Sequence, residues 1–459
     1  MAVAAQVTEN DLTRLDEIIA EERAAFLARQ PKSRELTERA KKHLVSGVTS
    51  SWQFSNPQPI WIDHGVGSKV WDADGFELVD LHGGYGANAT GHAHPLIVKA
   101  IQERVTKGTH FGQPVEDAIA VSEELSKRWG LPLWRFGQSG TESTMDAVHL
   151  MRAITGKWKI IKVEGSYHGH HDSVQVDVYN EEDELGDPKH PNSVAGEGGI
   201  PDEIVQLTRC VPYNDLDALD ALLTELDGEV AGMIIEPIMM NIGIIFPEND
   251  YIKGVREVTK KHGVLLAFDE VKTGFTTRPG GASEYLGVTP DIVCVAKTLG
   301  GGTVVSGIGG TEETMGQIDQ GPYEQCGTFN GNPLGMAAAR AAICDILTPD
   351  AYEHAEKLRQ IMTSGVEATI DEYELPAYVP SIGFKGCVVF SPTKIRNYRD
   401  YLSWDDRFSQ AHWFFQNKGG VFLPPWGKVE QWMVSVQHSE QDVQKFVDNF
   451  AAFAKALRG

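Results

Sequence analysis

Residues 291–310 read DIVCVAKTLGGGTVVSGIGG, an apolar run that meets one lysine and then a cluster of glycines. The run has the composition of a buried strand, so Lys297 is expected at the point where that strand ends. A lysine in this position is usually a surface residue whose carbon stem lies along apolar surface. The alternative is an amine held at a ligand site, where glycines let the backbone approach the ligand closely.

Similar short apolar runs recur along the chain, separated by segments with helical periodicity. They cover residues 134–137, 159–165, 231–237, 263–271, 291–297 and 306–310. Short apolar runs that alternate with helices are typical of a largely parallel sheet that is buried on both faces. We therefore expect an α/β domain, in which ligands bind at the carboxyl ends of the strands.

The two ends of the chain have a different pattern of apolar and polar residues. Residues 10–46 carry apolar residues at helical spacing, which predicts an N-terminal helical arm. From residue 58 short apolar runs alternate with HGVG and DADG turns, which predicts small antiparallel strands, and Pro95 of GHAHP suits a helix start. Beyond residue 345 we expect a helix, short strands and a closing helix near 439–457.

These differences in residue pattern divide the chain into three stretches. We assign residues 1–90 to the helical arm and the first part of a small domain, 91–344 to a large domain, and 345–459 to the rest of the small domain. The acidic, turn-rich stretch 179–203 is too long for an ordinary connection. It is either a mobile loop near a site or a plain surface insertion.

Composition and charge exclude several classes of protein. The chain has 459 residues, 41% of them hydrophobic, and a formal charge of −23, which repels nucleic acids and anionic membrane surfaces. Five scattered cysteines without CxxC spacing argue against a disulfide framework and a zinc site. The first residues lack the pattern of a signal peptide, and no apolar run approaches the roughly 18 residues of a membrane span. We expect a cytoplasmic protein.

Two further strand ends carry side chains that could bind a ligand or take part in catalysis. The run GVLLAFDEV ends in Asp269 and Glu270, although a helix-capping Asp explains this motif equally well. In GQSGTEST (137–144), the amides of a helix start and the hydroxyls of Ser139 and Thr141 would form a phosphate cradle. Alone, such a turn is no more than a strand-to-helix connection with an N-cap.

The stretch GSYHGHHD (165–172) adds an aromatic residue and three histidines after another strand. The histidines have no HExxH pattern or cysteine partner, so we expect no metal. A phosphate cradle, a stacking aromatic ring, a carboxylate and a lysine are together what pyridoxal 5'-phosphate requires. The lysine forms a Schiff base, and the carboxylate keeps the pyridine nitrogen protonated. P-loop and GxGxxG patterns, which bind nucleotides, do not occur at these turns.

The sequence resembles the class III aminotransferases of fold type I, particularly the branch of glutamate-1-semialdehyde aminomutases and omega-transaminases. The resemblance runs from about residue 44 through 345 and more faintly to the end. It rests on WDADGFELVDL, GHAHP, SGTEST, SYHGHHD, EPIMMN, LLAFDEVKTGF, GGASEYLGVTPDIVCVAKTLGGG and GTFNGNP. It implies a mostly parallel seven-stranded sheet flanked by helices, a smaller α+β domain built from both chain ends, and a homodimer with shared active sites.

The resemblance also implies roles for individual residues. Lys297 would be the Schiff-base lysine and proton carrier, Asp269 would pair with the pyridine nitrogen, and Tyr167 would stack on the ring opposite Val271. These three, Lys297, Asp269 and Tyr167, are the expected catalytic residues. The remaining cofactor-binding candidates are Ser139, Gly140 and Thr141 for the phosphate, His168, Glu236 near Asp269, Asn241 for the phenolic oxygen, and Thr328 for the neighbouring subunit's phosphate.

One segment departs from the aminomutase pattern. Where aminomutases carry an arginine that grips the substrate carboxylate, residues 47–54 read GVTSSWQF and place Gln53. A neutral amide lacks the charged, bidentate fork of arginine. Trp52, Gln53 and Tyr85 are therefore our candidates for a partly aromatic substrate pocket, although ordinary packing explains the aromatic residues equally well.

The expected function is transfer of an amino group from an amine or amino acid to a keto acid or aldehyde by a ping-pong cycle. The main alternative is glutamate-1-semialdehyde 2,1-aminomutase, against which Gln53 argues. A lyase or decarboxylase on the same scaffold, a non-catalytic protein that retains the fold, and a nucleotide-dependent dehydrogenase are weaker alternatives.

Overall fold

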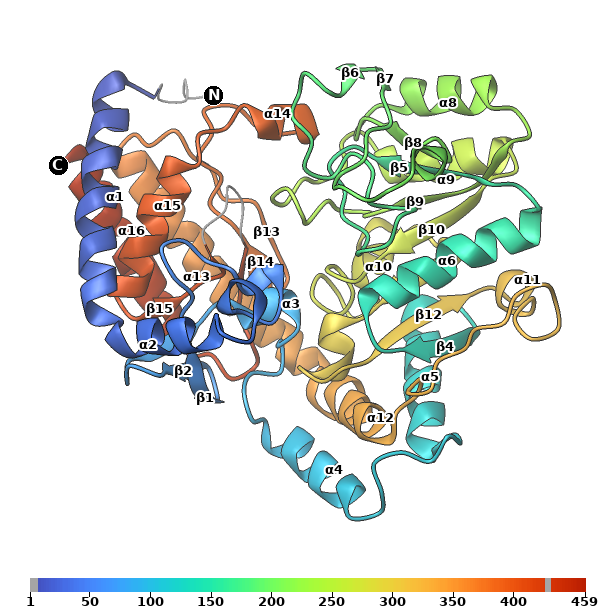
Figure 1. The fold of residues 1–459 in the computed structure, drawn as a ribbon, viewed down its shortest axis with the longest axis horizontal. Helices are drawn as coiled ribbons and strands as arrows, with labels where there is room; N and C mark the ends of the chain where they lie inside the picture. Colours follow the sequence, from blue (N-terminus) through green and yellow to red (C-terminus); the bar gives the residue numbers. More distant parts are fainter. Residues whose placement is uncertain (1–6, 426–430) are drawn as a thin grey trace. The chain divides into compact units, whose positions relative to one another are not determined.

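The computed structural model describes residues 7–425 and 431–459. The chain forms two compact units, each described here by itself (Figure 1). The central unit comprises Pro95–Tyr352 and Ile395–Ser403, and the terminal unit comprises Met1–His94, Glu353–Lys394 and Trp404–Gly459. Among the described residues, no helix is both long and apolar enough to cross a membrane.

The central unit is built on a seven-stranded sheet, which confirms the expected α/β fold. The strand order is β4-β12-β11-β10-β9-β5-β8. The strands are β4 (Leu133–Gly137), β5 (Lys159–Val163), β8 (Thr208–Val211), β9 (Val230–Ile235), β10 (Leu265–Asp269), β11 (Ile292–Val295) and β12 (Ser306–Gly310). The strands from β11 to β8 are parallel, and only β12 runs antiparallel to its neighbours β11 and β4.

The sequence patterns did not reveal β8. Its residues TRCV mix polar and apolar side chains, and it lies at the edge of the sheet, where it pairs only with β5. Thr208 is buried although it is polar, because its hydroxyl donates to the Ser173 carbonyl at 2.7 Å, so this short strand lacks a continuous apolar run. The six interior and opposite-edge strands coincide with the apolar runs of the sequence.

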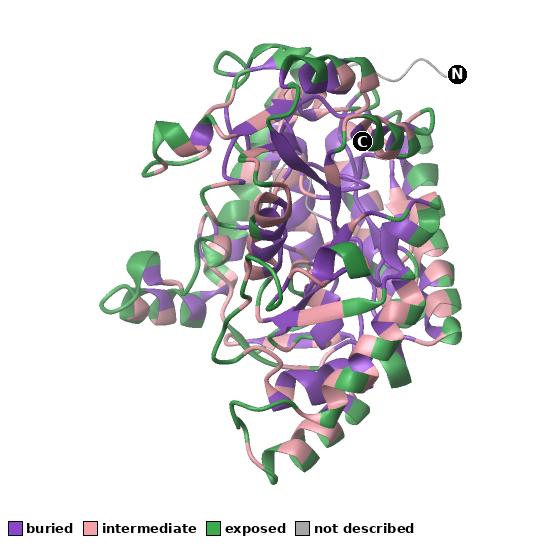
Figure 2. Cartoon of the chain, turned by 90° about the vertical axis from the view of Figure 1, so that its right-hand side faces the viewer, coloured by how far each residue is buried: buried purple, intermediate pink, exposed green. Residues whose placement is uncertain are grey.

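Helices and turns cover the central sheet. They are α4 (Pro95–Val105), α5 (Glu116–Trp129), α6 (Gly140–Thr155), α7 (Asp202–Val205), α8 (Leu216–Glu225), α9 (Tyr251–Lys261), α10 (Gly281–Leu286), α11 (Glu312–Met315), α12 (Pro333–Arg340) and α14 (Tyr398–Leu402). α4 begins at Pro95, as expected. The apolar face of α6 packs against the sheet through Val148, Leu150 and Met151. Figure 2 shows the resulting concentration of buried residues on strands and inward helix faces.

The terminal unit combines long helices with small sheets. Its helices are α1 (Glu9–Arg29), α2 (Pro31–Ala40), α3 (Gly83–Gly86), α13 (Pro349–Glu372, whose first turn belongs to the central unit), α15 (Arg407–Lys418) and α16 (Glu440–Arg458). One sheet contains β1 (Ile62–Val66), β2 (Lys69–Asp72), β3 (Glu77–Asp80) and β15 (Val421–Phe422), and another contains β13 (Ser381–Ile382), β14 (Lys385–Gly386) and β16 (Trp432–Met433). α1 packs on α15, where the Phe26 ring meets Trp413 edge-on with centroids 5.4 Å apart.

The stretch 179–203 is tied down by α14. It contains a short hairpin of β6 (Gly186–Asp187) and β7 (His190–Pro191). The Arg399 guanidinium donates to the Gly186 carbonyl at 2.7 Å and pairs with the buried Glu164 carboxylate at 3.0 Å. The Tyr398 hydroxyl donates to the Asn180 carbonyl at 2.9 Å. The helix α14, which comes from the C-terminal part of the chain, thus contacts this stretch at residues 180 and 186.

Glu270 anchors the chain that follows β10. Its carboxylate is buried and accepts hydrogen bonds from the Ala282 and Ser283 amides at 2.7 and 2.8 Å. The hydroxyls of Ser283 and Thr273 each donate to it at 2.6 Å. Gly281 has φ +68°, and a Cβ there would lie 2.2 Å from the Glu270 carboxylate. The second strand-end carboxylate therefore has a structural role, fastening the start of α10.

Replacing Glu270 by Gln is expected to lower the free energy of unfolding by about 1–3 kcal/mol, because the new amide NH2 would face a backbone N–H, which can only donate. Urea unfolding followed by circular dichroism measures the loss. The control is Glu229→Gln, which removes a partly exposed pair with Lys159 and should change stability by less than about 0.5 kcal/mol. Equal stability of the two variants would contradict the anchor role.

His412 on α15 gives the stability a defined pH dependence. Its ring is buried against Phe446 and Phe450, and burial lowers its pKa to about 3. In the unfolded chain the imidazole binds a proton below about pH 6.5, whereas the folded chain excludes it. Stability from this residue is therefore lost as pH falls from about 6.5, by up to about 1.4 kcal/mol per pH unit.

His412→Leu should remove this contribution, so the difference in unfolding free energy between wild type and variant should be nearly constant above about pH 6.5 and shift progressively as pH falls from there to about 5. Urea titrations at several pH values measure it. His43→Leu, at an exposed position, serves as the control and should leave the pH dependence unchanged. A wild-type-minus-His412→Leu difference that is constant with pH would show that the buried imidazole is not excluded from protonation.

Candidate active site

Four neighbouring parallel strands deliver the candidate residues to one edge of the central sheet. In the pairing register Asp269 lies opposite Cys294, and Phe268 lies opposite Ile235. Lys297 follows β11, Asp269 ends β10, Glu236 follows β9 and Tyr167 follows β5. Because parallel strands end on the same side, these residues leave the sheet at its carboxyl edge, the usual ligand site of such sheets.

Asp269 is a buried carboxylate held by two neighbours. Its Oδ2 lies 2.8 Å from Nδ1 of His168, and its Oδ1 accepts the backbone N–H of Val271 at 2.9 Å. The Asp269 side chain is 5% exposed and that of His168 is 1% exposed. Within residues 7–425 and 431–459, the buried Nε2 of His168 has no hydrogen-bond partner. The pair presents a fixed negative charge, with lone pairs remaining for a cationic N–H.

The backbone of Tyr167 is fixed by Glu236. The carboxylate of Glu236 accepts the Tyr167 N–H at 3.0 Å through one oxygen and the Met240 N–H at 2.8 Å through the other. The Asn241 side-chain amide donates to the Tyr167 carbonyl at 3.4 Å. Burial, and then the charge of Asp269, raises the pKa of the Tyr167 phenol, so the ring stays neutral. Glu236 and Asn241 therefore position a neutral aromatic ring beside the buried carboxylate.

The phosphate cradle expected at the start of α6 has an additional member. Ser139 is the N-cap of α6, and its hydroxyl accepts the Glu142 N–H at 3.2 Å. The Glu142 carboxylate in turn accepts the N–H groups of Gln138 and Ser139 at 2.6 and 3.3 Å. We did not anticipate Glu142, although the S-x-x-E pattern of SGTE is the signature of such a capping box.

Gly140 and Thr141 complete this turn. A Cβ at Gly140 would lie 2.9 Å from a methyl group of Val271, so only glycine lets the helix start approach this residue. The Thr141 hydroxyl accepts the His170 N–H at 3.1 Å. The turn at 138–141 thus joins the loop that carries Tyr167 and His168 to the segment that follows Asp269.

Lys297 begins a helical turn with a left-handed backbone. Its φ is +47°, in a conformation that non-glycine residues rarely adopt, and its side chain is half-buried. Such a conformation costs about 1–3 kcal/mol and is concentrated at functional sites. The strain occurs at the one lysine that the sequence places at this strand end, which weighs against the reading as an ordinary surface lysine.

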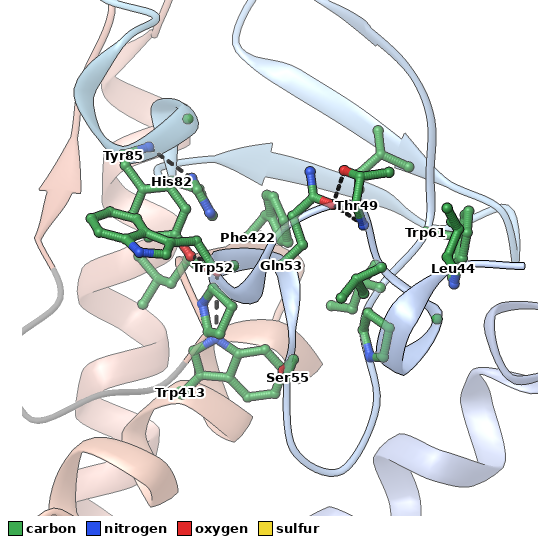
Figure 3. A pocket seen from close by; sticks show the side chains of 18 residues that line it. Leu44, Thr49, Trp52, Gln53, Ser55, Trp61, His82, Tyr85, Trp413 and Phe422 are labelled. Atoms are coloured by element: carbon green, nitrogen blue, oxygen red, sulfur yellow. Dashed lines mark hydrogen bonds between the residues drawn. The ribbon is translucent and has the colours of Figure 1, made fainter. Parts of the chain in front are cut away.

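Trp52, Gln53 and Tyr85 lie together in the terminal unit, where they line a cavity of about 510 Å³ (Figure 3). The Trp52 and Tyr85 rings pack edge to face with centroids 4.9 Å apart, and the Tyr85 hydroxyl donates to the Trp52 carbonyl at 2.6 Å. Trp61, Trp413 and Phe422 add further aromatic walls. We call this the aromatic cavity. Among the described residues that line it, none is Asp, Glu, Lys or Arg.

Thr328 is separate from the other candidates. It is exposed and lines a different cavity of the central unit, of about 480 Å³, together with Arg135 and Gln325. No other candidate residue lines that cavity. Its placement agrees with a residue that serves a neighbouring subunit, a role that stays a prediction.

The chemistry of the strand-end groups fits pyridoxal 5'-phosphate. The positive end of α6 suits the phosphate, a buried carboxylate suits a protonated pyridine nitrogen, and a strand-end amine suits an aldehyde. Gly140 lets the start of α6 approach Val271, two residues after Asp269, so the helix start and the strand end lie close together. Each group that the cofactor needs is therefore present in the central unit.

Comparisons with known proteins agree with this geometry. The family model of class-III aminotransferases matches residues 52–452. The chain is 35% identical over 434 residues to glutamate-1-semialdehyde 2,1-aminomutase 2 of Brevibacillus brevis, which covers 93% of this chain and 99% of that protein.

Two solved structures share the fold along nearly the whole chain. An omega-transaminase from Sphaerobacter thermophilus has a TM-score of 0.88 at 32% identity and covers 94% of this chain and 100% of its own. A glutamate-1-semialdehyde aminomutase from Pseudomonas aeruginosa PAO1 in complex with PMP has a TM-score of 0.89 at 27% identity, with 97% and 99% covered. The chain is thus an enzyme of the class-III aminotransferase family, with fold type I and pyridoxal 5'-phosphate as its cofactor.

Proposed function

We propose that the enzyme is a transaminase that takes the amino group from an amine with an apolar or aromatic body and passes it to a keto acid or aldehyde. The observation that carries the proposal is the aromatic cavity, which the described residues line without a single charged side chain. Gln53, at the place of the aminomutase arginine, lines this cavity. A substrate carboxylate would find no counter-charge there, whereas an aromatic ring would be well packed.

The cofactor supplies an electron sink for the carbanion formed when the substrate loses a proton. We assign Lys297 to hold the cofactor aldehyde and to move a proton when substrate is bound. Asp269, held by His168 and Val271, would keep the pyridine nitrogen protonated. Tyr167 and Val271 would pack against the ring.

The remaining candidates are proposed to bind and orient. Ser139, Gly140 and Thr141 would hold the phosphate at the positive end of α6. Asn241 would donate to the phenolic oxygen, and Thr328 would reach the phosphate bound by the neighbouring subunit of a homodimer. Its exposure in a cavity apart from the other candidates supports this last role.

The second candidate function is glutamate-1-semialdehyde 2,1-aminomutase. It is favoured by the 35% identity to the Brevibacillus brevis protein of that name over nearly its whole length. The same cofactor residues would serve both reactions, so the difference lies in how the substrate body is held. Gln53 and the uncharged cavity favour the transaminase.

Purified enzyme should convert one enantiomer of 1-phenylethylamine with pyruvate to acetophenone, and the amine alone should bleach the cofactor absorption band. Lys297→Ala should lower both rates by at least about 100-fold, because the proton carrier is lost. Acetophenone formation and absorbance spectra measure these effects. Lys157→Ala, which changes a lysine between α6 and β5, should match wild type.

Conversion of glutamate-1-semialdehyde without any reaction of the amine would overturn the proposal in favour of the aminomutase. Transamination by Lys297→Ala at a rate near that of wild type would overturn the assignment of the proton carrier.

A further inference from the structure

We propose that Thr49 locks Gln53 as a hydrogen-bond donor in the aromatic cavity, so that the enzyme prefers substrates whose aromatic body carries a neutral acceptor oxygen. This inference rests on the proposed function for its kinetic test, whereas its binding test does not. It assigns a specificity-determining role to Gln53 and a positioning role to Thr49.

The orientation of the Gln53 amide is fixed by its partner. The Gln53 Oε1 accepts the Thr49 backbone N–H at 3.1 Å and the Thr49 hydroxyl at 2.6 Å. A backbone N–H can only donate, so the atom that faces it must be the amide oxygen. The nitrogen therefore lies on the side away from Thr49, as Figure 3 shows. With the oxygen occupied twice, Gln53 offers its two N–H groups.

Ordering a glutamine side chain costs about 1.5–2 kcal/mol of rotamer entropy. Thr49 and Gln53 are exposed, and their two hydrogen bonds across the short helical turn Ser51–Gln53 offset part of that cost before a substrate arrives. A substrate then meets a donor already held in place. Preorganised groups of this kind discriminate between ligands more strongly than mobile ones.

His82 supplies a second oriented group in the same wall. Its Nδ1 accepts the Tyr85 backbone N–H at 3.2 Å, so in the neutral imidazole the proton is on Nε2. The ring is stacked on Phe422 with centroids 5.2 Å apart and meets Tyr85 edge-on at 4.5 Å. Its plane is thus fixed by packing, and its polar edge is of donor type.

The other polar groups of the described residues that line the cavity are neutral, so the N–H donors of Gln53 and His82 are not opposed by a negative charge there. The Tyr85 hydroxyl donates to the Trp52 carbonyl, and the Trp61 indole N–H donates to Thr37 at 2.9 Å. The Ser55 hydroxyl can donate or accept. An ether or carbonyl oxygen matches this wall, whereas a carboxylate would lose its hydration without gaining a cation.

The kinetic test compares three amines that differ only at the ring position para to the reacting group: 1-(4-methoxyphenyl)ethylamine, 1-(4-ethylphenyl)ethylamine and 1-(4-carboxyphenyl)ethylamine. The methoxy and ethyl groups have nearly the same shape, so their ratio of kcat/KM isolates the acceptor oxygen. We expect a ratio of about fivefold in wild type, corresponding to one hydrogen bond. The carboxylate should be the poorest substrate.

Variants of Gln53 and Thr49 test which residues cause the methoxy-to-ethyl ratio of kcat/KM. In Gln53→Leu, which keeps the bulk and removes the donors, the methoxy-to-ethyl ratio should fall to about one. Thr49→Val should lower it, because the hydroxyl that holds the amide is gone, and Thr49→Ser should restore it. Thr49→Val should have no further effect on the ratio in the Gln53→Leu background.

The binding test uses the ketones 4-methoxyacetophenone and 4-ethylacetophenone, which need no turnover. Quenching of tryptophan fluorescence reports their binding, because Trp52, Trp61 and Trp413 line the cavity. A methoxy preference that disappears in Gln53→Leu supports the inference even if no amine reacts, in which case only the proposed function fails. Equal binding of both ketones to wild type, or a ratio unchanged by Gln53→Leu, overturns the inference even if the amines react. Identical ratios for Thr49→Val and Thr49→Ser overturn the positioning role of Thr49.

Discussion

The charge of Asp269 is the constraint on which the rest of the site depends. A carboxylate in the interior of a parallel sheet is costly unless hydrogen bonds and a cation offset its lost hydration. The chain meets part of this cost with its own groups, the His168 imidazole and the Val271 amide. In the proposed function, the protonated pyridine nitrogen of the cofactor would supply the missing cation. The sheet therefore has to bring the loop after β5 and the turn after β10 together, and the strand order does so.

Glu270, the carboxylate next to Asp269, differs from it in how many of its hydrogen-bonding positions are already occupied. Glu270 is the next residue along the chain, yet its oxygens are fully used by the amides and hydroxyls at the start of α10. Asp269 keeps capacity for an outside partner, whereas Glu270 has none to spare. Under the proposed function Asp269 would bind the cofactor, whereas the adjacent Glu270 has a structural role.

Much of this could be predicted from the sequence, because the interior strands and the residues at their ends follow from apolar runs and local motifs. β8 was missed because its four residues, TRCV, mix polar and apolar side chains. The Thr49 and His82 contacts could not be foreseen, because they depend on side-chain orientations within a short irregular segment. Glu142 could have been found from its spacing to Ser139. The N-cap at this turn was anticipated as an alternative, but the reciprocal bond from Glu142 was not.

The attachment of α14 to the central unit has a consequence for biosynthesis. Glu164 is buried, and its cationic partner Arg399 lies 235 residues further along the chain. While the ribosome is still making the central unit, this carboxylate lacks its Arg399 partner, and the stretch around 180–190 lacks its hydrogen bonds to α14. The helix α1 can pack on the aromatic residues of α15 only after α15 has been synthesised, which is later still. The nascent enzyme must therefore carry an unfinished surface on its largest unit until almost nine-tenths of the polypeptide has emerged.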